Sequence, residues 1–326
     1  YSAGAHDTAV LVTSPLAQGL FSAAVVMSHT WLVQPSAVVT NTMQVAVRYL
    51  NCDTASDVVA CLRSKTAAQV VAVPGNGASN LAADPSCASI GCRFNLASVD
   101  GHVLPKTPRQ TVREGNHNKV PMLVGSTARE WTTTYYILGQ NIVSDTDYQS
   151  ILFKTFPTAV ANVVYSLYPP SSYTAGYYSA PASAYIIAMG DIYHHCPARN
   201  MLNEIGARQT QPLWQYAWAH GPNPPLYAGH MTDFPYIFLT YAPGSLSSSE
   251  QTLSNNMSEA WLRFIANHDP WSATLDWPAY QPATYNFRFW ETPELLGNNN
   301  SVVQARWRHS QCDLLEQNGF DWEVFP

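Results

Sequence analysis

The chain of 326 residues is 46% hydrophobic and 12% charged, with a formal net charge of −6, a composition that excludes an intrinsically disordered protein. A chain of this length buries a substantial core, and the lack of any Lys/Arg run argues against a nucleic-acid partner. No apolar stretch reaches the ~18 residues of a membrane-spanning helix.

Helices and strands alternate in the first part of the chain. Residues 3–13 are predicted to form a helix after a tight turn, and the short apolar run at 21–28 predicts a buried strand of a parallel sheet. The pattern over 35–72 is helical, with Thr54 or Ser56 as the candidate N-cap of one helix.

A long irregular segment is predicted at 73–118, which holds Pro, Gly, Asn and Ser with little periodicity. The later elements are a strand at 120–127, mostly helix over 145–205, a strand at 212–220, a helix at 254–268, a strand at 285–290 and a terminal helix at 301–319. This alternation predicts an α/β fold with a mainly parallel sheet, and no convincing linker divides it.

Six cysteines indicate an oxidising compartment. They form two pairs that are close in sequence and one remainder: Cys52 with Cys61, Cys87 with Cys92, and Cys196 and Cys312. An even count with two local pairs favours disulfides. Zinc is the alternative, but the sequence has no C-x-x-C pair and no His at ligand spacing from these thiols, so no metal is predicted.

Two sequons agree with a secreted, extracellular protein. Asn256-Met-Ser258 and Asn299-Asn-Ser301 are both potential N-glycosylation sites. Three-residue patterns also arise by chance, so each sequon alone is a weak signal.

The first four residues, Tyr1-Ser2-Ala3-Gly4, match the second half of a G-x-S-x-G turn. A serine hydroxyl is a poor nucleophile until a base takes its proton, and α/β-hydrolases place it on such a turn between a strand and a helix. A serine in a frayed N-terminus is the alternative. The predicted helix, loop and buried strand over 3–28 supply the context that the turn requires, so Ser2 is the candidate nucleophile.

Several segments resemble, in order, those of the type-B carboxylesterases. The family's elbow segment resembles SAGAHDTAVLVTSPLAQGLFSAAVVMS, and its short disulfide loop resembles NCDTASDVVACLRS. Its Asp-Gly, Leu-Pro and Pro-x-Leu-x-Gly segment resembles SVDGHVLPKTPRQTVREGNHNKVPMLVGSTARE. Its histidine segment resembles YAGHMTDFPYIF, and its late helix and Trp-Pro-x-Tyr resemble AWLRFIANHDPW and DWPAY. The family includes cholinesterases, fungal sterol esterases and lipases, and the non-catalytic neuroligins.

This resemblance covers almost the whole chain and implies an α/β-hydrolase fold, with helices on both faces of the sheet. In the family a long segment precedes the serine and supplies early strands and a glycine-rich oxyanion loop. Residues 1–326 are therefore expected to be the C-terminal portion of a single domain, without the N-terminal strands. The N-terminal portion, as a separate or missing chain, is the expected partner, because the sheet alone would expose a long edge and an apolar face.

The resemblance also implies a triad in the order Ser, acid, His. The implied base is His230, on a loop after a strand, and a solvated loop histidine is the alternative. The implied acid is Glu130, directly after the strand at 120–127. The family has Asp-Glu-Gly here, whereas this chain has Arg129-Glu130-Trp131, so a surface Arg–Glu pair is the alternative.

Other titratable residues are weaker candidates. Asp145 and Asp147 fit the cap of the next helix, and His194 and His195 are expected to be structural. His6 lies on the helix after the elbow, on the wrong side to act as the base.

Five more residues receive roles from the resemblance. The backbone N–H of Ala3 is expected to donate to the oxyanion. Ser28 and Asp233, which replaces the usual glutamate, match a buried pair behind the triad, although both also fit ordinary polar residues at element ends. Tyr1, Trp131 and Tyr227 are candidates to line an acyl or alcohol pocket, with a simple core position as the alternative.

Two disulfides have counterparts in the family. Cys52–Cys61 resembles its short loop, and Cys196–Cys312 resembles its long-range bridge to the final helix. Cys87–Cys92 is then the remaining pair, without a counterpart.

The expected function is that of a secreted serine hydrolase that cleaves small-molecule or lipid carboxylic esters without a cofactor. An acyl-enzyme on Ser2 would be its intermediate. The alternative is a catalytically inactive family member used for adhesion or binding, and such members commonly lose the serine. A structural fragment with a fortuitous S-x-G is a third reading.

Overall fold

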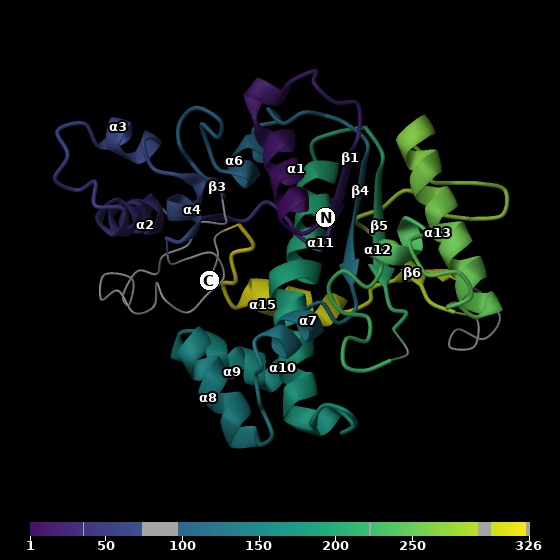
Figure 1. Ribbon diagram of the computed structural model, residues 1–326. Coiled ribbons are helices and arrows are strands. Elements are labelled where there is room, and N and C mark those ends of the chain that lie inside the picture. The colour runs from purple at the N-terminus through teal and green to yellow at the C-terminus, as the bar shows by residue number, and fades with distance from the viewer. Residues whose placement is uncertain (35, 74–96, 222, 293–300, 324–326) are drawn as a thin grey trace.

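A computed structural model describes residues 1–34, 36–73, 97–221, 223–292 and 301–323 (Figure 1). Its centre is a five-stranded sheet with the order β1-β4-β5-β6-β7. The strands are β1 (Ala24–Met27), β4 (Met122–Thr127), β5 (Leu213–Trp218), β6 (Asn286–Trp290) and β7 (Ser301–Ala305). The first four are parallel and β7 is antiparallel to β6, which confirms the predicted mainly parallel sheet.

Helices cover both faces of this sheet, as predicted. One face packs against α1 (Ala3–Thr13) and α11 (Cys196–Gly206), and the other packs against α12 (Phe234–Ile237) and α13 (Ser248–Asn267). Alternate residues of a strand point to opposite faces, so the two cores draw on the same strands. In β4, Met122 and Val124 join the first core, whereas Leu123 joins the second.

A glycine in β4 makes a close strand contact possible. A Cβ on Gly125 would lie 2.1 Å from the ring of Tyr216 on β5, so this position accepts no side chain. At this position Gly125 pairs with Met27 of β1 on one side and with Tyr216 of β5 on the other.

A helical region lies beyond the carboxyl end of the sheet (Figure 1). It contains α7 (Trp131–Ile137), α8 (Asp145–Thr155), α9 (Thr158–Leu167), a 3₁₀ turn (Pro170–Ser172) and α10 (Ala180–Gly190). A π-helical turn (Asp191–His195) continues α10 into α11. The disulfide Cys196–Cys312 joins α11 to α15 (His309–Gln317), so the predicted long-range bridge is present.

A second group of helices lies to one side of α1 (Figure 1). We call α2 (Ser36–Tyr49), α3 (Val58–Arg63) and α4 (Ala67–Val71), with the turns between them, the side lobe. The predicted Cys52–Cys61 disulfide closes the turn between α2 and α3. Cys87 and Cys92 lie outside the described residues.

The remaining short elements connect these parts. They are a 3₁₀ turn (Pro15–Ala17), β2 (Val33–Gln34), β3 (Ala97–Ser98) and α6 (Pro108–Arg113), and β2 pairs with β3 in a parallel two-stranded sheet. None of the helices in the described part of the chain combines the length and apolar character that crossing a bilayer requires.

Three sequence predictions are wrong in detail. The terminal helix predicted over 301–319 begins only at His309, because residues 301–305 pair instead with the edge of β6. The N-cap of α3 is Asp57, whose carboxylate accepts the N–H of Ala60 at 2.9 Å, and not Thr54 or Ser56. The segment predicted as irregular contains α6, whose Thr107 cap and first-turn proline are signals that the periodicity argument missed.

Candidate active site

Ser2 lies on a strained turn at the start of α1. Its φ is 54° and its ψ is −124°, a conformation rare for residues other than glycine. The Ser2 N–H donates to Met27 O at 2.9 Å, and the Gly4 N–H donates to Tyr1 O at 3.0 Å. These bonds hold the turn against the end of β1 and expose the Ser2 hydroxyl at the carboxyl edge of the sheet.

His230 lies within hydrogen-bond distance of this hydroxyl. Its Nε2 is 2.9 Å from Ser2 Oγ, although the two residues are 228 positions apart. Two contacts fix the loop around it: the His230 N–H donates to Glu130 O at 3.2 Å, and Thr133 Oγ1 donates to His230 O at 3.0 Å. The position predicted for the base therefore faces the predicted nucleophile.

Glu130 completes a hydrogen-bonded chain of three side chains. Its Oε2 is 2.7 Å from His230 Nδ1, and its Oε1 accepts the N–H of Thr127 at 2.6 Å. Only 1% of Glu130 is exposed, so it is not half of a surface Arg–Glu pair. Arg129 turns away and lies over the ring of Tyr227, 4.9 Å from its centroid.

The charges of this chain of side chains suit a base held by an anion. Burial by itself would raise the pKa of Glu130, but the imidazoles of His194 and His230 outweigh it and lower that pKa to about 2. Burial opposes protonation of His230, yet the hydrogen bond and charge of Glu130 raise the pKa of His230 above its usual value. Glu130 is therefore ionised, and His230 Nδ1–H donates to it, which leaves Nε2 free to accept the serine proton.

Other histidines named by the sequence have other partners. His6 Nε2 contacts Leu32 O at 2.8 Å, and its ring packs against that of His29 with centroids 5.0 Å apart. His195 packs against Trp307 with ring centroids 4.5 Å apart. Asp147 caps α8 with Ser144, as the sequence predicted, and takes no part in the site.

The backbone N–H of Ala3 stands at the first position of α1. The first N–H groups of a helix lack an intrahelical acceptor, and no acceptor for Ala3 is found among the described residues. This group is thus available as an anion donor next to Ser2.

Ser28 and Asp233 both lie behind the candidate triad, and each contacts the side chain of Tyr1. The Ser28 hydroxyl donates to Tyr1 Oη at 3.1 Å, and the Met231 N–H also donates to Tyr1 Oη. Asp233 is fully buried and accepts the hydroxyl of Tyr216 at 3.0 Å. The Tyr1 ring packs on His230 with ring centroids 5.1 Å apart, so Tyr1 supports the candidate base.

Asp233→Asn is expected to change how stability depends on pH. Burial and the charge of Glu130 raise the pKa of Asp233 to about 7, against ~3.9 in an unfolded chain. The folded state therefore binds more protons than the unfolded state between pH 4 and 7, and this group lowers stability as pH rises through that window, by on the order of 4 kcal/mol. The neutral amide of Asn removes this loss of stability.

Melting temperatures of the parent and of Asp233→Asn at pH 5 and pH 8 measure the loss, with the exposed Asp53→Asn as the control. If Asp233→Asn kept the pH dependence of the parent, the raised pKa of Asp233 would be contradicted.

His194 is a site residue that the sequence argument set aside as structural. It lies in the π-helical turn, a feature often found at functional sites. Its ring centroid is 5.7 Å from that of His230, and its Nδ1 lies 3.0 Å from Ser28 O. Because a carbonyl only accepts, Nδ1 carries the proton and donates to Ser28. The signal that would have found it is the pair His194-His195 directly before Cys196, but the π-helical turn that aims it is not visible in the sequence.

Glu130, His194 and His230 are also the set of possible metal ligands found in the described residues. Their ligand atoms all lie within 4.8 Å of one another, and two imidazoles with a carboxylate suit zinc. Glu130 and His230 already bond each other at 2.7 Å, however, and His230 faces Ser2. The geometry therefore fits a triad better than a metal centre.

His194→Leu is expected to lower the free energy of unfolding by about 1–3 kcal/mol, because the buried Ser28 carbonyl loses its donor. His194→Asn is the matched variant, since its amide N–H can take the place of Nδ1–H, and it is expected to recover at least half of the loss. Chemical denaturation of both variants measures the difference. Equal losses in the two would show that ring packing, and not the hydrogen bond, is what His194 contributes.

The three candidate pocket residues have different ring partners among the described residues. Trp131 is half-buried, stacks on Tyr193 with centroids 5.0 Å apart against the core of the helical region, and has its ring 6.4 Å from that of His194. Tyr227 lines a pocket of about 230 Å³ together with His220 and Tyr236, and no triad residue lines that pocket. A shared acyl pocket built from Tyr1, Trp131 and Tyr227 remains a prediction.

Of the two predicted glycosylation sites, one lies within the described residues. Asn256 is half-buried in the middle of α13, and Ser258 of the same sequon is buried. Asn299 lies outside the described residues.

Comparison of the amino-acid sequence with known proteins points to one family. A sequence model of the "Carboxylesterase family" matches residues 1–305. Carboxylesterase 1C of Mus musculus is 26% identical over 302 residues, which cover 86% of this chain and 52% of the relative. The para-nitrobenzyl esterase of Bacillus subtilis is 24% identical over 199 residues, 59% of this chain and 38% of the relative. The chain thus spans about half, or less, of the curated relatives it matches.

Solved structures show the same fold. A carboxylesterase of Geobacillus stearothermophilus superposes with a TM-score of 0.76 at 19% identity, over 96% of this chain and 62% of that one. A PNB esterase gives a TM-score of 0.71 at 20% identity, with the same coverages. These neighbours are α/β-hydrolases, so the predicted fold class is confirmed. With the match over residues 1–305, the chain belongs to the carboxylesterase family.

Proposed function

We propose that this chain carries the catalytic triad of a secreted serine hydrolase that cleaves carboxylic esters. The observation that supports this most is the continuous chain of contacts from Ser2 Oγ to His230 Nε2 and from His230 Nδ1 to Glu130 Oε2. Both distances lie within the range that proton transfer requires. The three residues come from separate parts of the sequence, so their convergence is a property of the fold.

The mechanism follows from these contacts. Ser2 Oγ attacks the ester carbonyl carbon while His230 Nε2 takes the hydroxyl proton, and Glu130 stabilises the imidazolium. The Ala3 N–H donates to the oxyanion of the tetrahedral intermediate. His230 then gives its proton to the leaving alcohol, and an acyl-enzyme remains on Ser2. Water, deprotonated by His230, attacks the acyl carbon, and the carboxylic acid leaves as Ser2 regains its proton.

One oxyanion donor is fewer than such sites commonly use. Because the curated relatives are about twice as long, we propose that an N-terminal portion of the same protein supplies the other donors. Small-molecule or lipid esters are the proposed substrates, and the names of the relatives, such as carboxylesterase and acylcarnitine hydrolase, agree with this class.

Secretion is supported by the two disulfides in the described residues, Cys52–Cys61 and Cys196–Cys312. Disulfides that persist are typical of oxidising compartments. The alternative, an inactive relative used for adhesion or binding, is disfavoured because Ser2, His230 and Glu130 are all present and in contact.

A fluorophosphonate tests the proposal directly. We expect the full-length native protein to form one covalent adduct, mapped by mass spectrometry to the peptide that contains Ser2. Heat-denatured protein and the Ser2→Ala variant are the controls, and neither is expected to react. No adduct on native protein would favour the inactive binding protein instead.

A further inference from the structure

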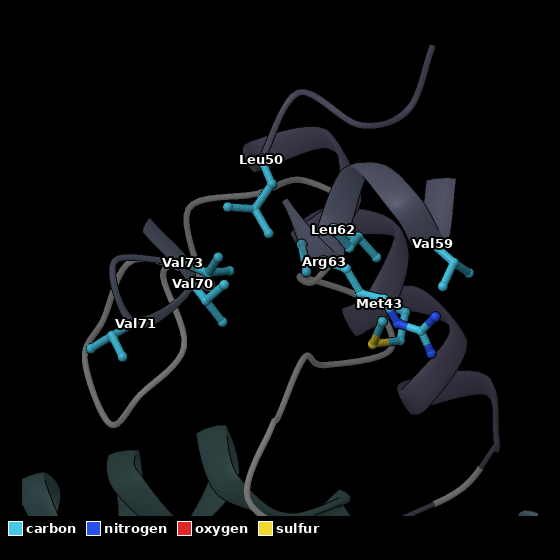
Figure 2. Close-up of a pocket in the computed structure, with 9 residues that line it drawn as sticks. Met43, Leu50, Val59, Leu62, Arg63, Val70, Val71 and Val73 are labelled. Carbon is cyan, nitrogen blue, oxygen red and sulfur yellow. The ribbon is translucent and has the colours of Figure 1, made fainter. Parts of the chain in front are cut away.

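The side lobe contains an open pocket that the triad does not use. It encloses about 490 Å³ between α2 and α3 on one side and α4 on the other (Figure 2). This volume lies within the ~300–1,000 Å³ typical of small-molecule sites. Nine residues line it, and Ser2, Glu130 and His230 are not among them.

The floor of the pocket is apolar and fixed. Ala46, Leu50 and Val73 are 6%, 8% and 6% exposed and belong, with Cys52, to the small core of the side lobe. The Cys52–Cys61 disulfide ties the end of α2 to α3 beside this floor. The pocket is therefore a concave surface held by a covalent bond, and a ligand would find it already formed.

The rim is also apolar, although it faces solvent. Met43, Val59, Val70 and Val71 are 45%, 55%, 47% and 64% exposed. Contiguous exposed apolar side chains around a concave surface mark binding sites more often than scattered ones do. A ligand that fits this rim must be largely hydrocarbon.

A single cation stands at one end of the pocket. Arg63 is the only charged residue among the nine that line it, and no acidic side chain in the described part of the chain pairs with it. Figure 2 shows its guanidinium beside Met43 and Val59, while Val70, Val71 and Val73 lie at the other end. A guanidinium binds carboxylates through two parallel hydrogen bonds. The pocket thus offers an anion site at one end and a hydrocarbon surface along the rest.

We propose that this pocket binds an aliphatic carboxylate, with its carboxylate on Arg63 and its chain across Ala46, Leu50 and Val73. The charge complementarity favours this ligand over a neutral lipid, and the concave form favours it over a flat protein partner. The site is separate from the triad, so the proposal does not depend on ester hydrolysis.

Photolabelling locates the ligand. The probe is dodecanoate with a diazirine near its methyl end, supplied as the free acid below its micelle concentration to the full-length protein. We expect peptide mapping to find the label within residues 36–73. Label found only on peptides that contain Ser2 or His230 would place the acid in the catalytic site and overturn the proposal.

Three variants test the two ends of the pocket, with affinity for unlabelled dodecanoate measured by calorimetry. Arg63→Ala is expected to weaken binding by about three- to fivefold, as for an exposed ion pair, whereas the remote Arg208→Ala leaves it unchanged. Val70→Asp places a charge on the apolar rim and is expected to weaken binding more than tenfold. Dodecanol, which lacks the carboxylate, is expected to lose nothing in Arg63→Ala.

Either of two results would overturn the proposal. One is unchanged dodecanoate affinity in both Arg63→Ala and Val70→Asp. The other is that a second copy or another segment of the protein covers the pocket. This would be seen if Met43 were protected from oxidation even when no dodecanoate is present.

Discussion

Ser2→Ala is expected to lower kcat for a carboxylic ester by about 10⁴-fold or more, with little change in KM. The hydroxyl is the only nucleophilic atom within hydrogen-bond distance of His230 Nε2, at 2.9 Å, in the described chain. The proposed oxyanion donor at Ala3 remains in the variant, so we expect a slow residual activity in which water attacks the ester directly. Steady-state kinetics of the full-length protein measure the loss.

The control for this variant is Ser28→Ala. Ser28 is buried behind the triad and contacts Tyr1, but it does not contact the proposed reacting atoms. We expect Ser28→Ala to keep kcat within about tenfold, because it removes hydrogen bonds to Tyr1 and Glu130 but no proposed reacting atom. Ser2→Ala removes no buried packing contact, so its melting temperature is expected to stay close to that of the parent. If Ser2→Ala kept most of the activity, the assignment of the nucleophile would be wrong.

The parallel strands of the central sheet could be predicted from the sequence because each is a short run of apolar residues or of alternating aromatic residues. The segments at 21–28, 120–127, 212–220 and 285–290 each contain a strand of the observed sheet. The exception is β7, which the sequence assigned to a helix. It pairs with β6, the strand before it in the sequence, and this tertiary contact overrides the helical pattern of its residues.

The candidate triad residues could be chosen from the sequence only through the resemblance. Composition and periodicity did not choose among ten histidines, whereas the ordered motifs chose His230. The structure adds what motifs do not carry. The π-helical turn at Asp191–His195 directs His194 toward Glu130, and the side lobe opens a pocket whose residues have no motif. The first feature depends on a local departure from α-helical geometry, and the second depends on how three short helices within residues 36–73 pack together.

Glu130→Gln is expected to lower kcat by about 10³–10⁴-fold and to move the acid limb of the pH profile to lower pH. His230 acts as a base only when neutral, and Glu130 raises its pKa above the usual value. In the parent, kcat/KM therefore falls as pH decreases through this raised pKa. The glutamine removes the negative charge, so the pKa of His230 falls and the limb follows it, even as the rate drops. A profile from pH 5 to 9 measures both effects.

The chain offers a matched control in a second buried His–Glu pair. His220 Nδ1 bonds Glu291, and its Nε2 bonds Glu250 at 3.0 Å, so this pair has the same chemistry but no serine within its contacts. Glu291→Gln is expected to keep kcat within about twofold and to leave the acid limb in place, whatever it costs in stability. A general loss of fold would lower activity in both variants. A loss of activity in Glu130→Gln alone, together with the shifted acid limb, would assign the effect to the imidazole that faces Ser2. Full activity in Glu130→Gln with a loss of activity in Asp145→Asn would instead show that the acid lies in another part of the chain.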